Sequence, residues 1–174
     1  AMYYDMVFDV FDDQEVVSFL QEQASRWKMR NPKDSGDHIR QNVEAGLLRT
    51  ILEGLEDCSI SGNFGFPQLA NAVTAVALDH PEDTPKWLDY LFAAGWSHKP
   101  PCFGGGINEV LIDRVDADGQ GDEASSYNNA WHKMLIEIAD VLDGYEKYPA
   151  ANLYNNPKFL QMFYSTIPLL SADY

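Results

Sequence analysis

The stretch PQLANAVTAVALD, at residues 67–79, decides the fold class. Apolar side chains occupy most of its circumference, so only Gln68, Asn71 and Thr74 are left to face water. Pro67 suits the first turn of a helix, because a backbone N–H at that position has no intrahelical partner. A helix that is apolar almost all round is buried in a protein core. The stretch therefore predicts the central helix of an all-α protein.

Helical spacing continues on both sides of this stretch, and no segment shows the period of two that is typical of strands. Capping residues and prolines mark where several of the helices begin. The predicted helices cover residues 14–29, 35–57, 67–79, 85–95, 127–145 and 157–167, with weaker helical spacing over 107–115. We expect an all-α fold, a compact single-domain bundle of about six or seven short to medium helices over residues 1–174.

The first of these helices has a recognisable apolar face. Val16, Leu20 and Trp27 share one side of it, with Val17 and Ala24 beside them. This spacing is that of a helix rather than a strand, so it predicts the first helix over residues 14–29.

The composition is strongly acidic. There are 27 Asp and Glu residues against 12 Lys and Arg, a formal net charge of −15. The hydrophobic share of 45% and the aromatic share of 13% exclude a disordered acidic chain. A negative field repels nucleic acid and anionic lipid and attracts basic proteins. We therefore expect a basic protein partner, with no direct binding to nucleic acid or to a membrane.

Two acidic clusters are the candidate partner-binding sites. Tyr3, Tyr4, Phe8 and Phe11 are interleaved with the first cluster, and aromatic contact area together with charge suits a protein-binding surface. The other interpretation is a generally acidic surface with those aromatic side chains inside. The candidate residues are Asp5, Asp9, Asp12, Asp13 and Glu15 in the first cluster, and Glu109, Asp113, Asp116, Asp118, Asp122 and Glu123 in the second.

The segment from Asp116 to Glu123 superficially resembles a calcium loop, because carboxylates alternate along it and a glycine follows. The twelfth position of such a loop, which needs a bidentate Glu, is Tyr127. A solvated loop between helices is the better interpretation.

The remaining chemical motifs are incomplete. His98 and Cys102 lack the further ligands of a zinc site, and the glycines of residues 104–106 lack the Lys-Ser/Thr pair of a phosphate-binding loop. Asp37-His38 resembles the dipeptide of metal-dependent phosphohydrolases, but His80 and His132 are too few to complete such a site. We expect no catalytic residue, no metal and no cofactor.

Localisation follows from what the sequence lacks. Cys58 and Cys102 are too few and too far apart for a disulfide framework, which favours a reducing compartment. The first residues do not read as a signal peptide, and no apolar stretch approaches the ~18–20 residues that span a bilayer. We expect a soluble, cytoplasmic protein.

These features favour a binding module that inhibits or sequesters a basic partner, such as a toxin or a nucleic-acid-handling defence enzyme. Bacterial immunity proteins and phage-encoded DNA mimics are of the same compositional type. Two alternatives stay open: a structural or assembly subunit of a viral or secretion system, and a small all-α hydrolase whose site is not visible in sequence.

Overall fold

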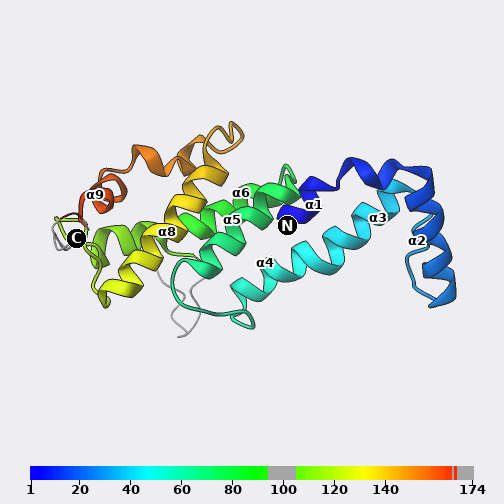
Figure 1. Cartoon of the computed structure of the whole chain (residues 1–174), viewed down its shortest axis with the longest axis horizontal. Helices are drawn as coiled ribbons and strands as arrows, with labels where there is room; N and C mark the ends of the chain where they lie inside the picture. The colour runs from blue at the N-terminus through cyan, green and yellow to red at the C-terminus, as the bar shows by residue number, and fades with distance from the viewer. Residues whose placement is uncertain (94–104, 166, 168–174) are drawn as a thin grey trace, which may run out of the picture.

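The computed structural model describes residues 1–93, 105–165 and 167, and α-helices dominate these ranges (Figure 1). Seven α-helices of the described residues have eight residues or more, and the one β-type pairing there is an isolated bridge between Val115 and Gly121. The prediction of an all-α bundle of about six or seven helices is confirmed.

The α-helices are α1 (Met2–Met6), α2 (Gln14–Arg26), α3 (Gly36–Val43), α4 (Arg49–Glu56), α5 (Phe66–Leu78), α6 (Asp83–Phe92), α7 (Ile107–Glu109), α8 (Ser125–Leu142) and α9 (Pro157–Ser165). The shorter segments are the 3₁₀ turns η1 (Asp9–Asp12), η4 (Pro149–Ala151) and η5 (Leu153–Asn155) and the π-helical turns η2 (Glu44–Leu48) and η3 (Val110–Arg114).

One long helix, α3–η2–α4, runs from the α2 end of the molecule to the bundle in Figure 1. Ser35 caps it, because its hydroxyl accepts a hydrogen bond from the backbone N–H of His38 at 3.2 Å. The helix ends after Glu56, and Cys58 follows with a left-handed φ of 70°. The predicted helix over residues 35–57 is therefore confirmed, with a π-helical turn inside it.

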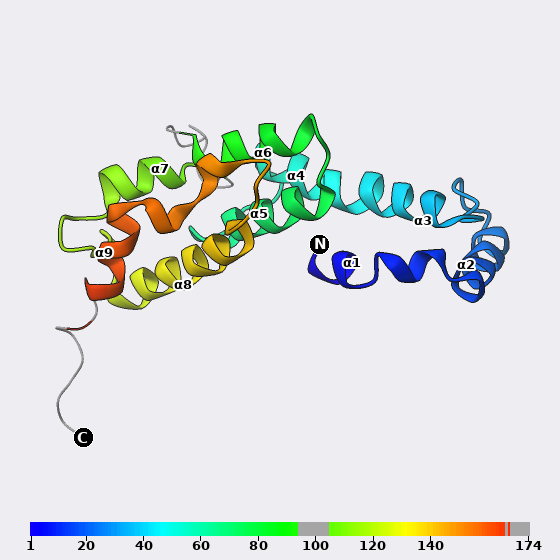
Figure 2. The same ribbon diagram turned by 90° about the horizontal axis from the view of Figure 1, so that it is seen from above.

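The main core lies in the bundle formed by α4 to α9, seen at the left of Figure 1 and from above in Figure 2. Helix α5 packs against both α6 and α8, and Leu52, Leu88, Leu135 and Phe159 are fully buried there. Helix α9 begins where the Asn156-Pro157 signal predicts, since the Asn156 side chain accepts hydrogen bonds from the backbone of Lys158 and Phe159.

Helix α5 is the buried central helix, but its polar side chains point the other way from the prediction. Gln68, Asn71 and Thr74 are buried, whereas Val73 and Val76 are only half-buried. The amide of Gln68 accepts from the backbone N–H of Gly65 at 2.8 Å and donates to the carbonyl of Gly105 at 2.9 Å. The prediction that these polar residues face water is wrong, because hydrogen bonds compensate for the burial of Gln68 and of Asn71, whose amide donates to the carbonyl of Trp87 at 3.3 Å.

Helix α2 lies at the far end of the molecule from the bundle (Figure 1), and it ends three residues earlier than the predicted range of 14–29. Val17 and Ala24 are buried, but neither belongs to the main core cluster, and Trp27 is 69% exposed. Trp27 follows the last residue of α2, and the left-handed Lys28, with a φ of 50°, turns the chain away there. The helix therefore ends at Arg26, and Trp27 lies at an exposed turn.

We predict that Gln68→Ala destabilises the fold, because it leaves the Gly65 N–H and the Gly105 carbonyl without their side-chain partner. The expected loss is about 1–3 kcal/mol in the free energy of unfolding, measured by urea denaturation. The matched control is Gln21→Ala on the exposed surface of α2, for which we expect a change within about 0.5 kcal/mol. Equal stability of the two variants would contradict the proposed role of the buried amide.

Candidate functional site

A groove of about 310 Å³ lies between α1, α5 and α8. Met2 and Met6 on α1 are 68% and 75% exposed, which is unusual for large apolar side chains. The valines of α5 reach this groove because the polar side of that helix is turned inward. The lining residues are Met2, Asp5, Met6, Val73, Val76, Ala77 and Val141.

Tyr4 attaches α1 to the rest of the protein. Its ring is 6% exposed, it packs edge-on against Phe8 at 5.6 Å between centroids, and its hydroxyl donates to Glu44 Oε1 at 2.7 Å. Burial, followed by the hydrogen bond to Glu44, raises the pKa of Tyr4 above its ordinary value. Tyr4 is therefore a buried anchor of α1 and not part of a partner surface.

Arg40 fixes the next segment, η1, to α3. Its guanidinium donates to both carboxylate oxygens of Asp12, at 2.6 and 3.0 Å, and to the backbone carbonyl of Phe8 at 2.9 Å. It also lies over the Phe8 ring, 4.3 Å from the centroid. The hydrogen bond from Arg40 holds the pKa of Asp12 below its ordinary value. Asp12 is thus occupied within the chain.

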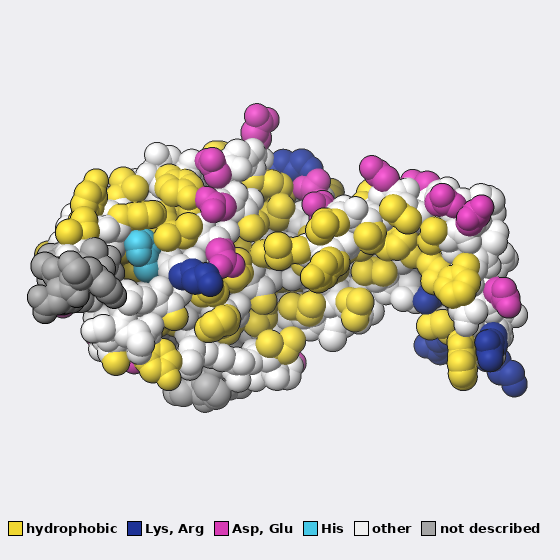
Figure 3. Space-filling view, viewed as in Figure 1, with side chains coloured by type: hydrophobic (Ala, Val, Ile, Leu, Met, Phe, Trp, Pro, Cys, Tyr) yellow, Lys and Arg dark blue, Asp and Glu magenta, His cyan; other side chains and the backbone are white. Residues whose placement is uncertain are grey.

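The other acids of the first cluster divide by role. Asp13 caps α2, because its carboxylate accepts from the backbone N–H of Glu15 at 2.7 Å. Asp5, Asp9 and Glu15 are exposed, and none of them forms an ion pair with a described residue. We call Asp5 and Asp9, together with the groove and the exposed Val7 and Val10, the N-terminal face. In Figure 3, acidic side chains gather along the edge over η1 and α2, above a band of hydrophobic side chains.

The second cluster is more strongly engaged within the chain. Arg114 pairs with Asp122 at 2.7 Å and with Glu123 at 3.7 Å, and Asp118 accepts from the backbone N–H of Gln120 at 2.9 Å. Glu109 is half-buried, whereas Asp113 and Asp116 are exposed. This loop lies at the opposite end of the molecule from α2 (Figures 1 and 2), so the structure does not bring the two clusters together.

Tyrosines of the second half also use carboxylates of their own chain. Tyr145 donates to Asp79 at 2.8 Å, Tyr148 donates to Asp89, and Tyr154 donates to Asp140. Burial, followed by the hydrogen bond to the carboxylate, raises the pKa of Tyr145 and of Tyr148 to about 12. These three tyrosines therefore bind carboxylates of their own chain and not those of a partner. Tyr3, by contrast, is 82% exposed.

The three described histidines lie on different parts of the fold. His38, on α3, contacts Asp34, and His80, between α5 and α6, accepts from the backbone N–H of Asp83. His132, on α8, packs against Phe163, and its burial lowers its pKa. Among the residues that the structure describes, no three or more His, Cys, Asp or Glu side chains are grouped so as to hold a metal ion. His98 lies outside the described residues.

Cys58 is disulfide-bonded, a bond that the sequence analysis does not predict. Cys102, the second cysteine of the sequence, lies outside the described residues. So does Gly104 of the glycine-rich loop, whereas the Gly105 carbonyl accepts the hydrogen bond from Gln68.

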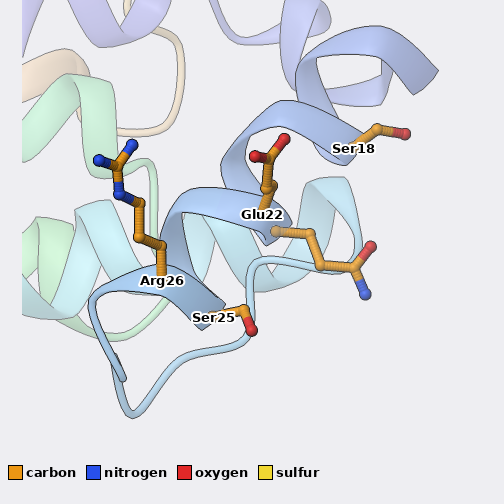
Figure 4. A pocket seen from close by; sticks show the side chains of 5 residues that line it. Ser18, Glu22, Ser25 and Arg26 are labelled. Carbon is orange, nitrogen blue, oxygen red and sulfur yellow. The ribbon is translucent and has the colours of Figure 1, made fainter.

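A second hollow, of about 640 Å³, lies along one polar side of α2. Figure 4 shows Ser18, Glu22, Ser25 and Arg26 projecting from this single helix, and Gln21 completes the lining. The hollow therefore offers no enclosed ligand site.

Comparison with known proteins assigns no relative: no protein-family model, curated protein or solved structure matches this chain. None of the described helices combines the length and the apolar character that crossing a bilayer requires.

We predict that Arg40→Ala loosens the N-terminal face without unfolding the bundle, because Arg40 hydrogen-bonds both Phe8 and Asp12 from α3. Protection of the backbone amides of residues 4–13 from hydrogen exchange should fall about tenfold, while amides of α8 keep theirs. The control is Arg114→Ala, which should leave residues 4–13 unchanged. Unaltered protection in the Arg40 variant would contradict the bridging role.

We predict that the protein loses stability as the pH rises from 10 to 12. The pKa values of Tyr145 and Tyr148 are about 12 in the folded state, above the ordinary value of 10.0, so the neutral hydroxyl is the form that the fold favours. This stabilisation is complete below pH 10 and is lost as the pH approaches the folded pKa. Thermal unfolding of the parent and of a Tyr145→Phe/Tyr148→Phe variant measures the effect. The stability of the variant should fall less steeply with pH than that of the parent. An equally steep fall would refute the assignment of this loss to Tyr145 and Tyr148.

Proposed function

We propose that this protein is a binding module whose N-terminal face engages a basic protein partner. The observation that carries the proposal is the apolar groove with exposed methionines on its rim and unpaired carboxylates beside it. Apolar area at the centre of a contact supplies affinity, and surrounding charges select and steer the partner. Methionine side chains adapt to partners of different shape.

The acids of the first cluster support this surface unequally. Asp5 and Asp9 lie on α1 and η1 with no cation of the described chain beside them, so their charge is available to Lys and Arg of a partner. Asp12 and Asp13 hold the surface in place through Arg40 and the α2 cap. In the second cluster Asp113, Asp116 and Asp118 are also exposed without an ion pair to a described residue, but the apolar groove is lined by Asp5 of the first cluster. The first cluster is therefore the better candidate.

We further propose that the role is non-enzymatic and that binding inhibits or sequesters the partner. A structural or assembly subunit is the second candidate, and the exposed apolar side chains of the N-terminal face favour it as well. The expected cytoplasmic location stays a prediction, and the disulfide at Cys58 argues against it, because such bonds are uncommon in reducing compartments.

We predict that Asp5→Asn/Asp9→Asn weakens capture of basic proteins from a lysate of the source cells, relative to the parent. The matched variant Asp113→Asn/Asp116→Asn changes the charge equally and should capture as the parent does. At low salt, the purified partner should then bind the parent more strongly than it binds Asp5→Asn/Asp9→Asn. This difference in affinity should shrink near 0.15 M salt, where the Debye length is about 8 Å.

A partner that binds the parent and both variants equally at every salt concentration would overturn the proposal. A partner whose binding depends on Asp113 and Asp116 instead would move the site to the second cluster and overturn the assignment to the N-terminal face. Circular dichroism of each variant should match that of the parent, because both pairs of acids are exposed.

A further inference from the structure

The turn after α2 carries a basic surface that contrasts with the rest of the chain. Residues 26–33 contain four cations and no acid, while the other residues carry eight cations and 27 acids, a formal balance of −19. We call this segment the tip. In Figure 3, Lys and Arg side chains gather at the lower right end of the molecule, below α2. The cations of the tip are Arg26, Lys28, Arg30 and Lys33.

The tip combines these cations with exposed apolar side chains. Trp27 is 69% exposed and Met29 is 44% exposed. Arg26 lies over the Trp27 ring, 5.6 Å from its centroid. None of the four cations is within ion-pair distance of a carboxylate of the described residues. An exposed Trp among unpaired cations is the composition expected of the centre of a protein contact.

The tip and the N-terminal face are complementary in chemistry. The face offers an apolar groove with Asp5 on its rim and Asp9 nearby, and the tip offers a tryptophan flanked by Lys and Arg. The two surfaces cannot meet within one molecule as folded here. Figures 1 and 2 both place α1 near the middle of the molecule and α2 at its end, with η1 between them.

We propose that the N-terminal face binds the tip of a second copy of this chain, with Trp27 entering the groove and Lys28 and Arg30 facing Asp5 and Asp9. This rests on the proposed function, since it names one basic surface, the tip of another copy, as an occupant of the same face. Because the tip and the face are different surfaces, the contact is head-to-tail and leaves each end of a bound pair open to another copy. Self-association of this kind also suits an assembly subunit.

The test is sedimentation of the full chain over a range of concentrations, with two variants that each lack one surface. The tip variant is Trp27→Ala/Lys28→Gln/Arg30→Gln, and the face variant is Asp5→Asn/Met6→Ser/Asp9→Asn. The parent should self-associate as its concentration rises. Its association constant should fall at least about tenfold from 0.05 to 0.5 M salt, because the Debye length shrinks over this range.

Each variant alone should stay monomeric. An equal mixture of the two should form a dimer and stop there, since only one intact tip and one intact face remain per pair. The matched control, Ile112→Ser/Asp113→Asn/Asp116→Asn, removes an exposed apolar side chain and two exposed acids elsewhere and should associate as the parent does.

A parent that stays monomeric at every concentration overturns the proposal. Association that survives in either variant, or that is lost equally in the matched control, also overturns it. If the protein stays monomeric and its tip binds anionic phospholipid vesicles, the tip is assigned to a membrane surface instead.

The tip variant keeps its N-terminal face, so it should still bind the basic partner. If the tip variant and the face variant bind each other but neither variant binds any basic protein, the proposed function fails and the self-association proposal stands.

Discussion

The buried hydrogen bonds of α5 are the constraint on which the rest of the structure depends. Leaving a buried amide without a hydrogen-bond partner costs about 1–3 kcal/mol. Full burial of a valine side chain stabilises the fold by only about 1.5 kcal/mol, and a half-buried valine keeps about half of that stabilisation. Gln68 has its partners inside the fold, at Gly65 and Gly105. The polar side of α5 therefore turns inward, and Val73 and Val76 are displaced toward α1. The apolar groove is a consequence of that orientation.

The net charge of −15 conceals different kinds of acid. Asp12 and Asp122 neutralise Arg40 and Arg114, and Asp79 accepts hydrogen bonds from Tyr145 and Lys147, which keep its pKa below the ordinary value. Such acids maintain the fold, and their field is largely cancelled by close cations. A count of acids in sequence cannot separate them from exposed ones such as Asp5, because the separating contacts join residues far apart in the chain.

The sequence predicts where helices lie better than it predicts which side of each is buried. Caps and prolines are local signals, so the starts at Ser35, Pro67 and Asn156 are recovered. The buried side depends on tertiary partners, and Gln68, which the sequence places toward water, is buried for that reason. The candidate site is recovered in part, because Asp5 and Asp9 belong to the predicted cluster, but the groove and the tip arise only when distant elements are in place.

The helix dipole explains the charges at the two ends of α2, but not the cations that follow the helix. Asp13 and Glu15 at its start and Arg26 at its end are the arrangement that the dipole favours. That effect fades within the last turn, so it does not account for Lys28, Arg30 and Lys33 beyond the helix. A helix of 13 residues is about 20 Å long, more than twice the Debye length of about 8 Å at physiological salt. The acids at one end of α2 therefore do not neutralise the tip at the other, and a partner meets it as a cationic surface on an acidic protein.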